Sequence, residues 1–183
     1  MSGASRPRRA HHRRPGGTRR GVTRAARRDL GNIAGMNRHF HHRNLPHLLL
    51  YAREALMAHF RPILNQAGVT EQQWRVLRTL SDLEPMEPNQ IAASCQILRP
   101  SLTRMLLGME QAGLIERARS SADQRRQDIS LTPKGRKLIE RMRPLVDQRY
   151  ENLEKTVGKD RLERLYRDID AAIELVKREP PAV

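Results

Sequence analysis

The sequence is poor in aromatic residues and cysteine, and both shortages exclude classes of protein. Aromatic residues make up 3% of the 183 residues, too few for a platform on which successive bases of single-stranded nucleic acid stack. Cys95 is the single cysteine, which excludes an intrachain disulfide framework and suits a reducing compartment. Apolar runs such as Leu48 to Leu50 are short, so we predict no transmembrane helix. The basic N-terminus has no apolar segment of the kind found in secretory signals, which favours a cytoplasmic protein.

Motifs of catalysis are also missing. The chain contains no Gly-rich phosphate loop, no zinc-ligand spacing and no nucleophile–base pair set by a motif. His39, His41 and His42 lie close together, but they lack acidic or thiol partners, so we expect no metal site there. We therefore predict a protein that is not an enzyme and uses no cofactor.

Positive charge is in excess and unevenly distributed. The chain has 35 Lys and Arg against 20 Asp and Glu, a formal net charge of +15, which favours a polyanionic partner such as nucleic acid or an acidic membrane surface. Residues 1–44 hold twelve Arg, no Lys and one acidic residue, Asp29, and thus carry +11. The remaining 139 residues therefore carry +4.

Residues 1–44 form a predicted disordered extension, because they mix Arg with Gly and Pro and show no apolar period. Such a basic arm adds non-specific affinity for DNA. The same composition fits a solvated extension without a binding role. It also leaves open a nucleoid-type or RNA-binding protein in which the extension dominates binding.

Apolar residues recur at helical spacing from Leu45 onward. The spacing predicts a helix over 45–67 that Gly68 ends, and a second that starts after a capping box formed by Thr70 and Gln73. Thr132 and Pro133 open a third long helix. Beyond Gly158, a last amphipathic helix completes a mainly α chain.

Two shorter helices over residues 86–97 and 98–112 have the layout of a helix-turn-helix. Leu102, Met105, Leu106 and Met109 lie on one apolar stripe of the second helix, and Ser101, Thr103, Arg104 and Gly108 point largely elsewhere. Such an outer face offers hydrogen-bond donors to base edges and phosphates in a major groove. We predict that the following residues contact DNA: Arg99, Pro100, Ser101, Thr103 and Arg104.

A β-hairpin is predicted after Gly113, because the segments LIERAR and QDISLT have a period close to two. Its tip carries Asp123, Arg125 and Arg126. A guanidinium suits a narrow minor groove, where negative potential is concentrated, and a nearby carboxylate holds it in one orientation. We predict that these three residues also contact DNA, although an ordinary solvated hairpin tip fits the same residues.

The fold class that follows is mainly α with a small β-hairpin wing, a winged helix-turn-helix with a helical dimerisation domain. We assign residues 70–132 to the DNA-binding region. Residues 45–69 and 133–178 form helices too apolar to stand alone, so we predict a helical dimerisation region. A homodimer would set two recognition helices one helical turn apart on double-stranded DNA with a pseudo-palindromic operator. We expect a cytoplasmic, nucleoid-associated protein without a membrane partner.

The stretch GLIERARSSADQRRQDISLTPKG at 113–135 resembles the MarR family of winged helix-turn-helix regulators. That family's pattern is Gly-Leu-[Ile/Val] at the end of the recognition helix, Asp-x-Arg in the wing, and Leu-Thr-x-x-Gly. These elements fall on 113–115, on Asp123 with Arg125, and on 131–135. The resemblance implies that Arg125 enters the minor groove, that Asp123 supports it, and that Arg126 contacts a phosphate.

ILRPSLTRML at 97–106, together with residues 45–64, looks similar to a subgroup of that family. Its members regulate operons for the degradation of homoprotocatechuate, nicotinate and related aromatic acids. The resemblance implies repression that a small aromatic carboxylate relieves by binding between the dimerisation helices and the winged module. Such a ligand needs a flat apolar wall and a cation, and the candidates are His47, Tyr51, Arg53, Trp74, Arg75 and Arg99.

Some of these side chains also fit plainer roles. Trp74 suits the core, and Arg53 suits a solvated helix face. Cys95 fits a buried small apolar residue, while a peroxide-sensing thiol, as in another branch of the family, is the alternative.

Overall fold

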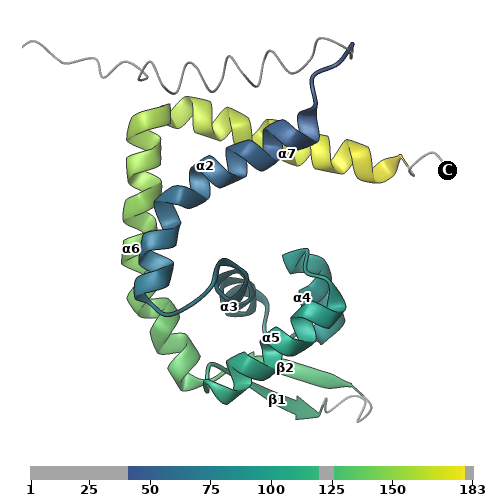
Figure 1. The fold of residues 1–183 in the computed structure, drawn as a ribbon, viewed down its shortest axis with the longest axis vertical. Coiled ribbons are helices and arrows are strands. Elements are labelled where there is room, and N and C mark those ends of the chain that lie inside the picture. The colour runs from purple at the N-terminus through teal and green to yellow at the C-terminus, as the bar shows by residue number, and fades with distance from the viewer. Residues whose placement is uncertain (1–40, 120–125, 180–183) are drawn as a thin grey trace, which may run out of the picture. The chain divides into compact units, whose positions relative to one another are not determined.

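The computed structural model describes residues 41–119 and 126–179. The predicted mainly α architecture with one hairpin is confirmed in these residues (Figure 1). The elements follow in the order α2 (Leu45–Gln66), α3 (Glu71–Leu83), α4 (Pro88–Cys95), α5 (Arg99–Gln111), β1 (Ile115–Arg119), β2 (Gln127–Leu131), α6 (Pro133–Val157) and α7 (Lys159–Arg178).

The chain divides into two compact units within α2, after Tyr51. The first unit contains the start of α2, where Asn44 Oδ1 accepts a hydrogen bond of 3.0 Å from the amide of His47. This bond satisfies one of the donors that every helix leaves free in its first turn. The second unit holds the rest of α2 and all the elements that follow.

The predicted helix ends are confirmed at α3, α5 and α6. Thr70 Oγ1 accepts from the amide of Gln73 at 3.2 Å, and Gln73 Oε1 accepts from the amide of Thr70 at 2.9 Å, which completes the capping box of α3. Gly113 adopts a φ of 69° just beyond α5, where a residue with a side chain would be strained. Thr132 caps α6 through a 3.1 Å bond from the amide of Gly135.

Helix α3 lies at the centre of the second unit and contacts α4, α6 and β2. Its buried face is formed by Val76, Leu77 and Leu80, none of which is exposed to solvent. The sheet and the helix-turn-helix add Ile91, Leu106, Met109, Ile115, Ile129 and Leu131 to the same core. Because interiors pack at the density of crystals, this core fixes the short helices and the hairpin relative to one another.

The hairpin is held at its base by more than its own strands. The strands β1 and β2 pair antiparallel with Ile115 opposite Leu131. Met86, between α3 and α4, pairs with the other edge of β2 through two bonds to Ile129 of 2.9 and 3.1 Å. Glu84 Oε2 accepts from the amide of Leu131 at 2.8 Å, and its other oxygen pairs with Arg136. The base of the hairpin is therefore tied to the end of α3.

Gly135 allows the backbone of α6 to approach the backbone that enters β1. A Cβ placed at Gly135 would lie 2.1 Å from the carbonyl oxygen of Leu114, a distance that no side chain tolerates. This contact explains physically why the Leu-Thr-x-x-Gly pattern ends in glycine at this position. None of the helices in the described ranges combines the length and the apolar character that a membrane span requires.

We expect Gly135→Ala to lower the free energy of unfolding by about 1–3 kcal/mol, the range for overpacked sites, because backbone must move to admit the new methyl group. Gly108→Ala is the matched control, since nothing lies within 4 Å of a Cβ at that helical position. That change should raise stability by about 0.5–1 kcal/mol. Urea unfolding of both variants measures the difference, and equal effects of the two changes would contradict the close approach.

Candidate nucleic-acid interface and ligand pocket

Helix α5 buries one stripe and exposes the residues that the sequence predicts to contact DNA. Leu102, Leu106 and Met109 are at most 2% exposed, so the helix cannot rotate without breaking the core. The exposed residues of its first turns are Arg99, Pro100, Ser101, Thr103 and Arg104. The Thr103 hydroxyl donates to the Arg99 carbonyl at 3.0 Å. The helix thus presents hydroxyls and guanidinium groups to solvent from a fixed scaffold.

The turn before α5 contains an apolar residue that the sequence analysis did not select. Gln96 adopts a left-handed conformation, with φ 50° and ψ 52°, and the amide of Ile97 bonds to the Ala92 carbonyl at 3.0 Å. Ile97 is buried, whereas Leu98 is 79% exposed. An apolar side chain at the N-cap position cannot accept a hydrogen bond from the helix. An exposed leucine at this position therefore indicates a role in binding rather than in folding. An exposed methyl group at this position is suited to contact a thymine methyl.

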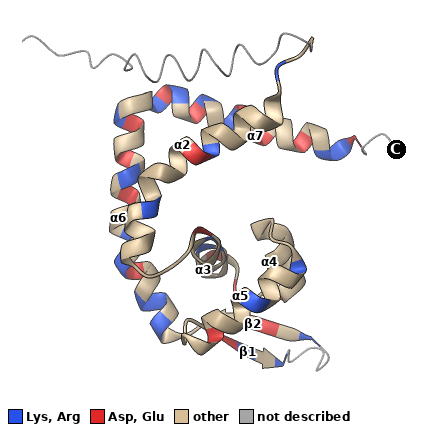
Figure 2. Ribbon diagram, viewed as in Figure 1, with Lys and Arg blue, Asp and Glu red and all other residues tan. Residues whose placement is uncertain are grey.

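Arg126 is the one predicted wing residue that the structure describes, and Asp123 and Arg125 lie outside the described residues. Its Nη1 donates to Glu87 Oε1 at 2.9 Å, while the side chain stays 60% exposed. Glu87 precedes α4, so the pair connects the hairpin with the helix-turn-helix. In Figure 2, both signs of charge are spread along α6 and α7, so these two helices do not present a surface of one sign.

A cavity of about 410 Å³ lies in the second unit, between the later part of α2, α3 and α6. The whole chain has six aromatic residues, and three of them line this cavity: Phe60, Trp74 and Tyr150. The rings of Phe60 and Tyr150 are 5.1 Å apart. These three aromatic side chains are half of those in the chain, and together they provide the flat apolar wall that an aromatic ligand needs.

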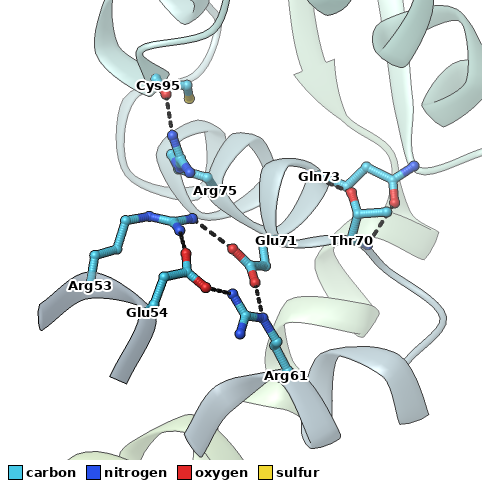
Figure 3. A network of polar contacts seen from close by, with 8 residues as sticks. All are labelled: Arg53, Glu54, Arg61, Thr70, Glu71, Gln73, Arg75 and Cys95. Carbon is cyan, nitrogen blue, oxygen red and sulfur yellow. Dashed lines mark hydrogen bonds and ion pairs between the residues drawn. The ribbon is translucent and has the colours of Figure 1, made fainter. Parts of the chain in front are cut away.

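The same cavity is lined by three arginines, which differ in their partners. Figure 3 shows two of them, Arg53 and Arg75. Arg53 Nη2 lies 2.6 Å from Glu71 Oε2, and Arg53 also pairs with Glu54. Arg75 donates instead to a neutral group, the carbonyl oxygen of Cys95, at 2.6 Å. The guanidinium of Arg78 lies 5.9 Å from the centre of the Tyr150 ring.

Arg53, Glu54, Arg61 and Glu71 form a closed cluster of four charges at this cavity (Figure 3). Burial acts to raise the pKa of the Glu71 carboxyl, but hydrogen bonds from Arg61 and Arg53 outweigh it, so the pKa lies below its usual value. The hydrogen bond to Glu54, with that to Glu71, raises the pKa of Arg61. Both shifts favour the charged forms of Glu71 and Arg61 in the folded protein.

The structure brings together three of the six predicted effector residues: Arg53, Trp74 and Arg75. Arg99 lies at the start of α5 and is not among the lining residues, and His47 and Tyr51 belong to the other unit. The sequence analysis missed Phe60, Arg78 and Tyr150. Arg78 could have been found, because it lies four residues after Trp74 on the same helix face. Tyr150 could not, since it comes from a distant part of the chain.

A second cavity, of about 530 Å³, is larger but chemically less suited to an aromatic acid. Lys134, Lys137 and Arg141 line it together with apolar residues, and no aromatic side chain takes part. We regard the smaller cavity as the candidate site because arginine side chains and aromatic rings line it together.

Cys95 is fully buried, as predicted for a small apolar residue. Its Sγ lies 3.5 Å from the hydroxyl oxygen of Thr79. His39 of the histidine group lies outside the described residues. Within residues 41–119 and 126–179, no three His, Cys, Asp or Glu side chains are grouped as metal ligands.

Comparisons with known proteins agree with this geometry. The profile of the MarR family matches residues 69–126. The HTH-type transcriptional regulator FarR of Neisseria gonorrhoeae is 44% identical over 114 residues, 62% of this chain and 78% of that protein. The homoprotocatechuate degradative operon repressor of Escherichia coli is 39% identical over 124 residues, 68% of this chain and 84% of that protein.

A solved structure of NadR in complex with 4-hydroxyphenylacetate is similar to this fold with a TM-score of 0.66. It is 43% identical, and the match covers 76% of this chain and 96% of that one. The relatives are transcriptional regulators and not enzymes, as the sequence predicts for this chain.

The charge cluster should make stability depend on acidity. Because the pKa of Glu71 is lowered in the folded protein, its contribution is complete above pH 4.5, the usual value, and is lost as the pH falls through the folded value. The free energy of unfolding of Glu71→Gln should therefore fall less steeply than that of the wild type as the pH is lowered below 4.5. Urea unfolding across this range measures it. Glu140→Gln, an exposed position on α6, is the control, and equal slopes for both variants would contradict the assignment.

Proposed function

This chain belongs to the MarR family of transcriptional regulators, and on that premise we propose a specific mode of action. The protein is a homodimeric repressor that binds a pseudo-palindromic operator in double-stranded DNA. A small aromatic carboxylate binds in the 410 Å³ cavity and releases the repressor from its operator. Three groups of observations support this proposal, and they concern α5, α7 and the cavity.

The exposed face of α5 is the observation that carries the DNA-binding role. Its buried stripe fixes the helix, and the hydroxyls and guanidinium groups on the other side point to solvent. We assign to DNA contact the residues Arg99, Pro100, Ser101, Thr103, Arg104, Asp123, Arg125 and Arg126, with Leu98 added. Base-edge contacts then come from α5 and a minor-groove contact from Arg125.

Helix α7 supports a homodimer because, among the residues that the structure describes, its apolar stripe is left partly exposed. Leu165, Ile173 and Val176 are 43%, 46% and 73% exposed, and they follow one another at helical spacing. Full burial of such a side chain is worth about 1.5–3 kcal/mol, of which the part that corresponds to the area still exposed is gained when a second copy of the chain supplies the matching surface. We therefore assign 45–69 and 133–178 to dimerisation and 70–132 to DNA binding.

The cavity supports a small aromatic carboxylate as the effector. Phe60, Trp74 and Tyr150 offer faces for a ring, and Arg75 and Arg78 offer cations for a carboxylate. The likeness to NadR, solved with 4-hydroxyphenylacetate, and to the repressor of the homoprotocatechuate operon supports the same chemical class. For His47, Tyr51 and Arg99, an effector contact remains part of the proposal without support from the cavity.

We expect Arg104→Ala and Arg125→Ala each to weaken operator binding by about 1–3 kcal/mol, the cost of losing a specific contact. The operator is a duplex that the protein selects from a random-sequence library, and affinity is measured by fluorescence anisotropy at fixed salt. Arg161→Ala, on the exposed surface of α7, is the matched control. The mass of each variant in solution reports whether the dimer persists.

Unchanged affinity in both variants would remove α5 and the wing from DNA recognition. Deletion of residues 1–35 tests the competing function, in which the basic extension dominates. If the truncated protein loses binding to all duplexes equally, the nucleoid-type or RNA-binding function is correct. If it still prefers the selected duplex, specific recognition belongs to the folded part.

We expect 4-hydroxyphenylacetate to raise the melting temperature, because a ligand of the native state stabilises it, by about 2.7 kcal/mol at one hundred times Kd. Phenol, which lacks the carboxylate, is the matched control and should give a much smaller rise. A thermal shift series over ligand concentration measures both. Equal shifts for the two compounds would mean that the arginines do not select a carboxylate.

A further inference from the structure

Arg75 contacts two functional parts of the molecule at once. It lines the cavity from α3, and its Nη1 donates to the carbonyl oxygen of Cys95 at 2.6 Å (Figure 3). Cys95 is the last residue of α4, and its carbonyl is one of the four that a helix leaves without a partner at its end. One side chain therefore joins the wall of the ligand cavity to the first helix of the helix-turn-helix.

The end of α4 sets the place where α5 begins. Cys95 is fully buried, and its Sγ lies 3.5 Å from the hydroxyl of Thr79, which also lines the cavity. After Cys95, three residues make the turn and α5 starts at Arg99. A cation at the C-terminus of a helix is stabilising because it complements the helix dipole. Loss of the Arg75 contact would therefore weaken the anchoring of this turn.

The partners of the three arginines decide which of them an incoming carboxylate engages. Arg53 is already paired with the carboxylates of Glu54 and Glu71. In the part of the chain that the structure describes, Arg75 and Arg78 form no ion pair, and Arg75 bonds to a neutral carbonyl. The existing bond has one charged partner, whereas a carboxylate adds a full negative charge and can accept from both nitrogens of the guanidinium edge. A ligand carboxylate therefore competes favourably for Arg75 and poorly for Arg53.

We propose that Arg75 is the positioning residue that couples the cavity to the DNA-reading helix. A carboxylate bound in the cavity draws the guanidinium away from the Cys95 carbonyl, and the turn between α4 and α5 loses its anchor. The operator-binding form keeps the Arg75–Cys95 bond, and the ligand-bound form gives it up, so each ligand disfavours the other. This inference rests on the proposed function, because it requires an effector that carries a carboxylate.

The experiment compares Arg75→Met with Arg78→Met, because the Arg78 guanidinium lies by the Tyr150 ring and, within the described residues, makes no hydrogen bond to α4. Operator affinity of the full-length dimer is measured without ligand and with 4-hydroxyphenylacetate raised until the melting temperature no longer changes. In the wild type, saturation should weaken operator binding by about 5- to 150-fold, the usual range of allosteric coupling. Without ligand, Arg75→Met should bind the operator about as weakly as the saturated wild type, and added ligand should change its affinity less than about twofold.

Arg78→Met should need more ligand but keep the coupling factor of the wild type at saturation. Arg75→Lys retains a cationic donor and should restore most of the coupling, which a loss of packing alone would not explain. Melting curves and the mass in solution verify that each variant is a folded dimer. Amide hydrogen exchange of residues 96–98 gives a direct readout: ligand should accelerate it in the wild type, and Arg75→Met should show the faster rate without ligand.

Each result decides between the proposals. If ligand-free Arg75→Met binds the operator as tightly as the wild type, while the wild type responds to ligand, the inference is overturned and the proposed function stands. If Arg78→Met loses coupling as completely as Arg75→Met, the link to α4 is likewise overturned. If saturated wild type binds the operator unchanged, both the effector part of the proposed function and the inference fail.

Discussion

The burial of one face of α3 is the constraint on which the other features depend. Val76, Leu77 and Leu80 are completely enclosed, and the helix contacts α4, α6 and β2 at the same time. Its opposite face supplies Trp74, Arg75 and Arg78 to the cavity of about 410 Å³. A helix of 13 residues thus carries the packing of the DNA-reading module on one side and the candidate effector site on the other. Because a close-packed interior transmits strain, α3 is the element through which the proposed coupling between the cavity and the module would pass.

Local rules were sufficient to predict most of the fold. Capping by Thr70 and Thr132, the glycine stop at Gly113 and the change of apolar period at the hairpin are encoded within a few residues, so they can be read from the sequence alone. The exposed polar face of α5 follows from the same helical spacing. The hydrogen bonds of Met86 and Glu84 to β2 could not be predicted from local sequence, because they join segments more than forty residues apart.

The cavity shows the same division between local and tertiary information. Trp74 and Arg75 could be selected because they are adjacent on one predicted helix, and Arg78 shares their face. Tyr150 and Phe60 meet them only after α6 and α2 have packed against α3. The most informative contact, from Arg75 to a backbone carbonyl of α4, could not be predicted, since every residue carries such a carbonyl. Sequence reasoning finds the side chains of a site better than it finds their partners.

The anchored base of the hairpin has a consequence for protein engineering. Met86, Glu84 and Gly135 hold β2 and the start of α6 by backbone pairing, a carboxylate and a close approach, and none of these contacts involves the loop between the strands. Loops that join fixed ends tolerate changes of length and composition at small entropic cost. The paired strands and the start of α6 should therefore keep their arrangement when the sequence between β1 and β2 is changed, because the contacts that fix them lie outside that sequence.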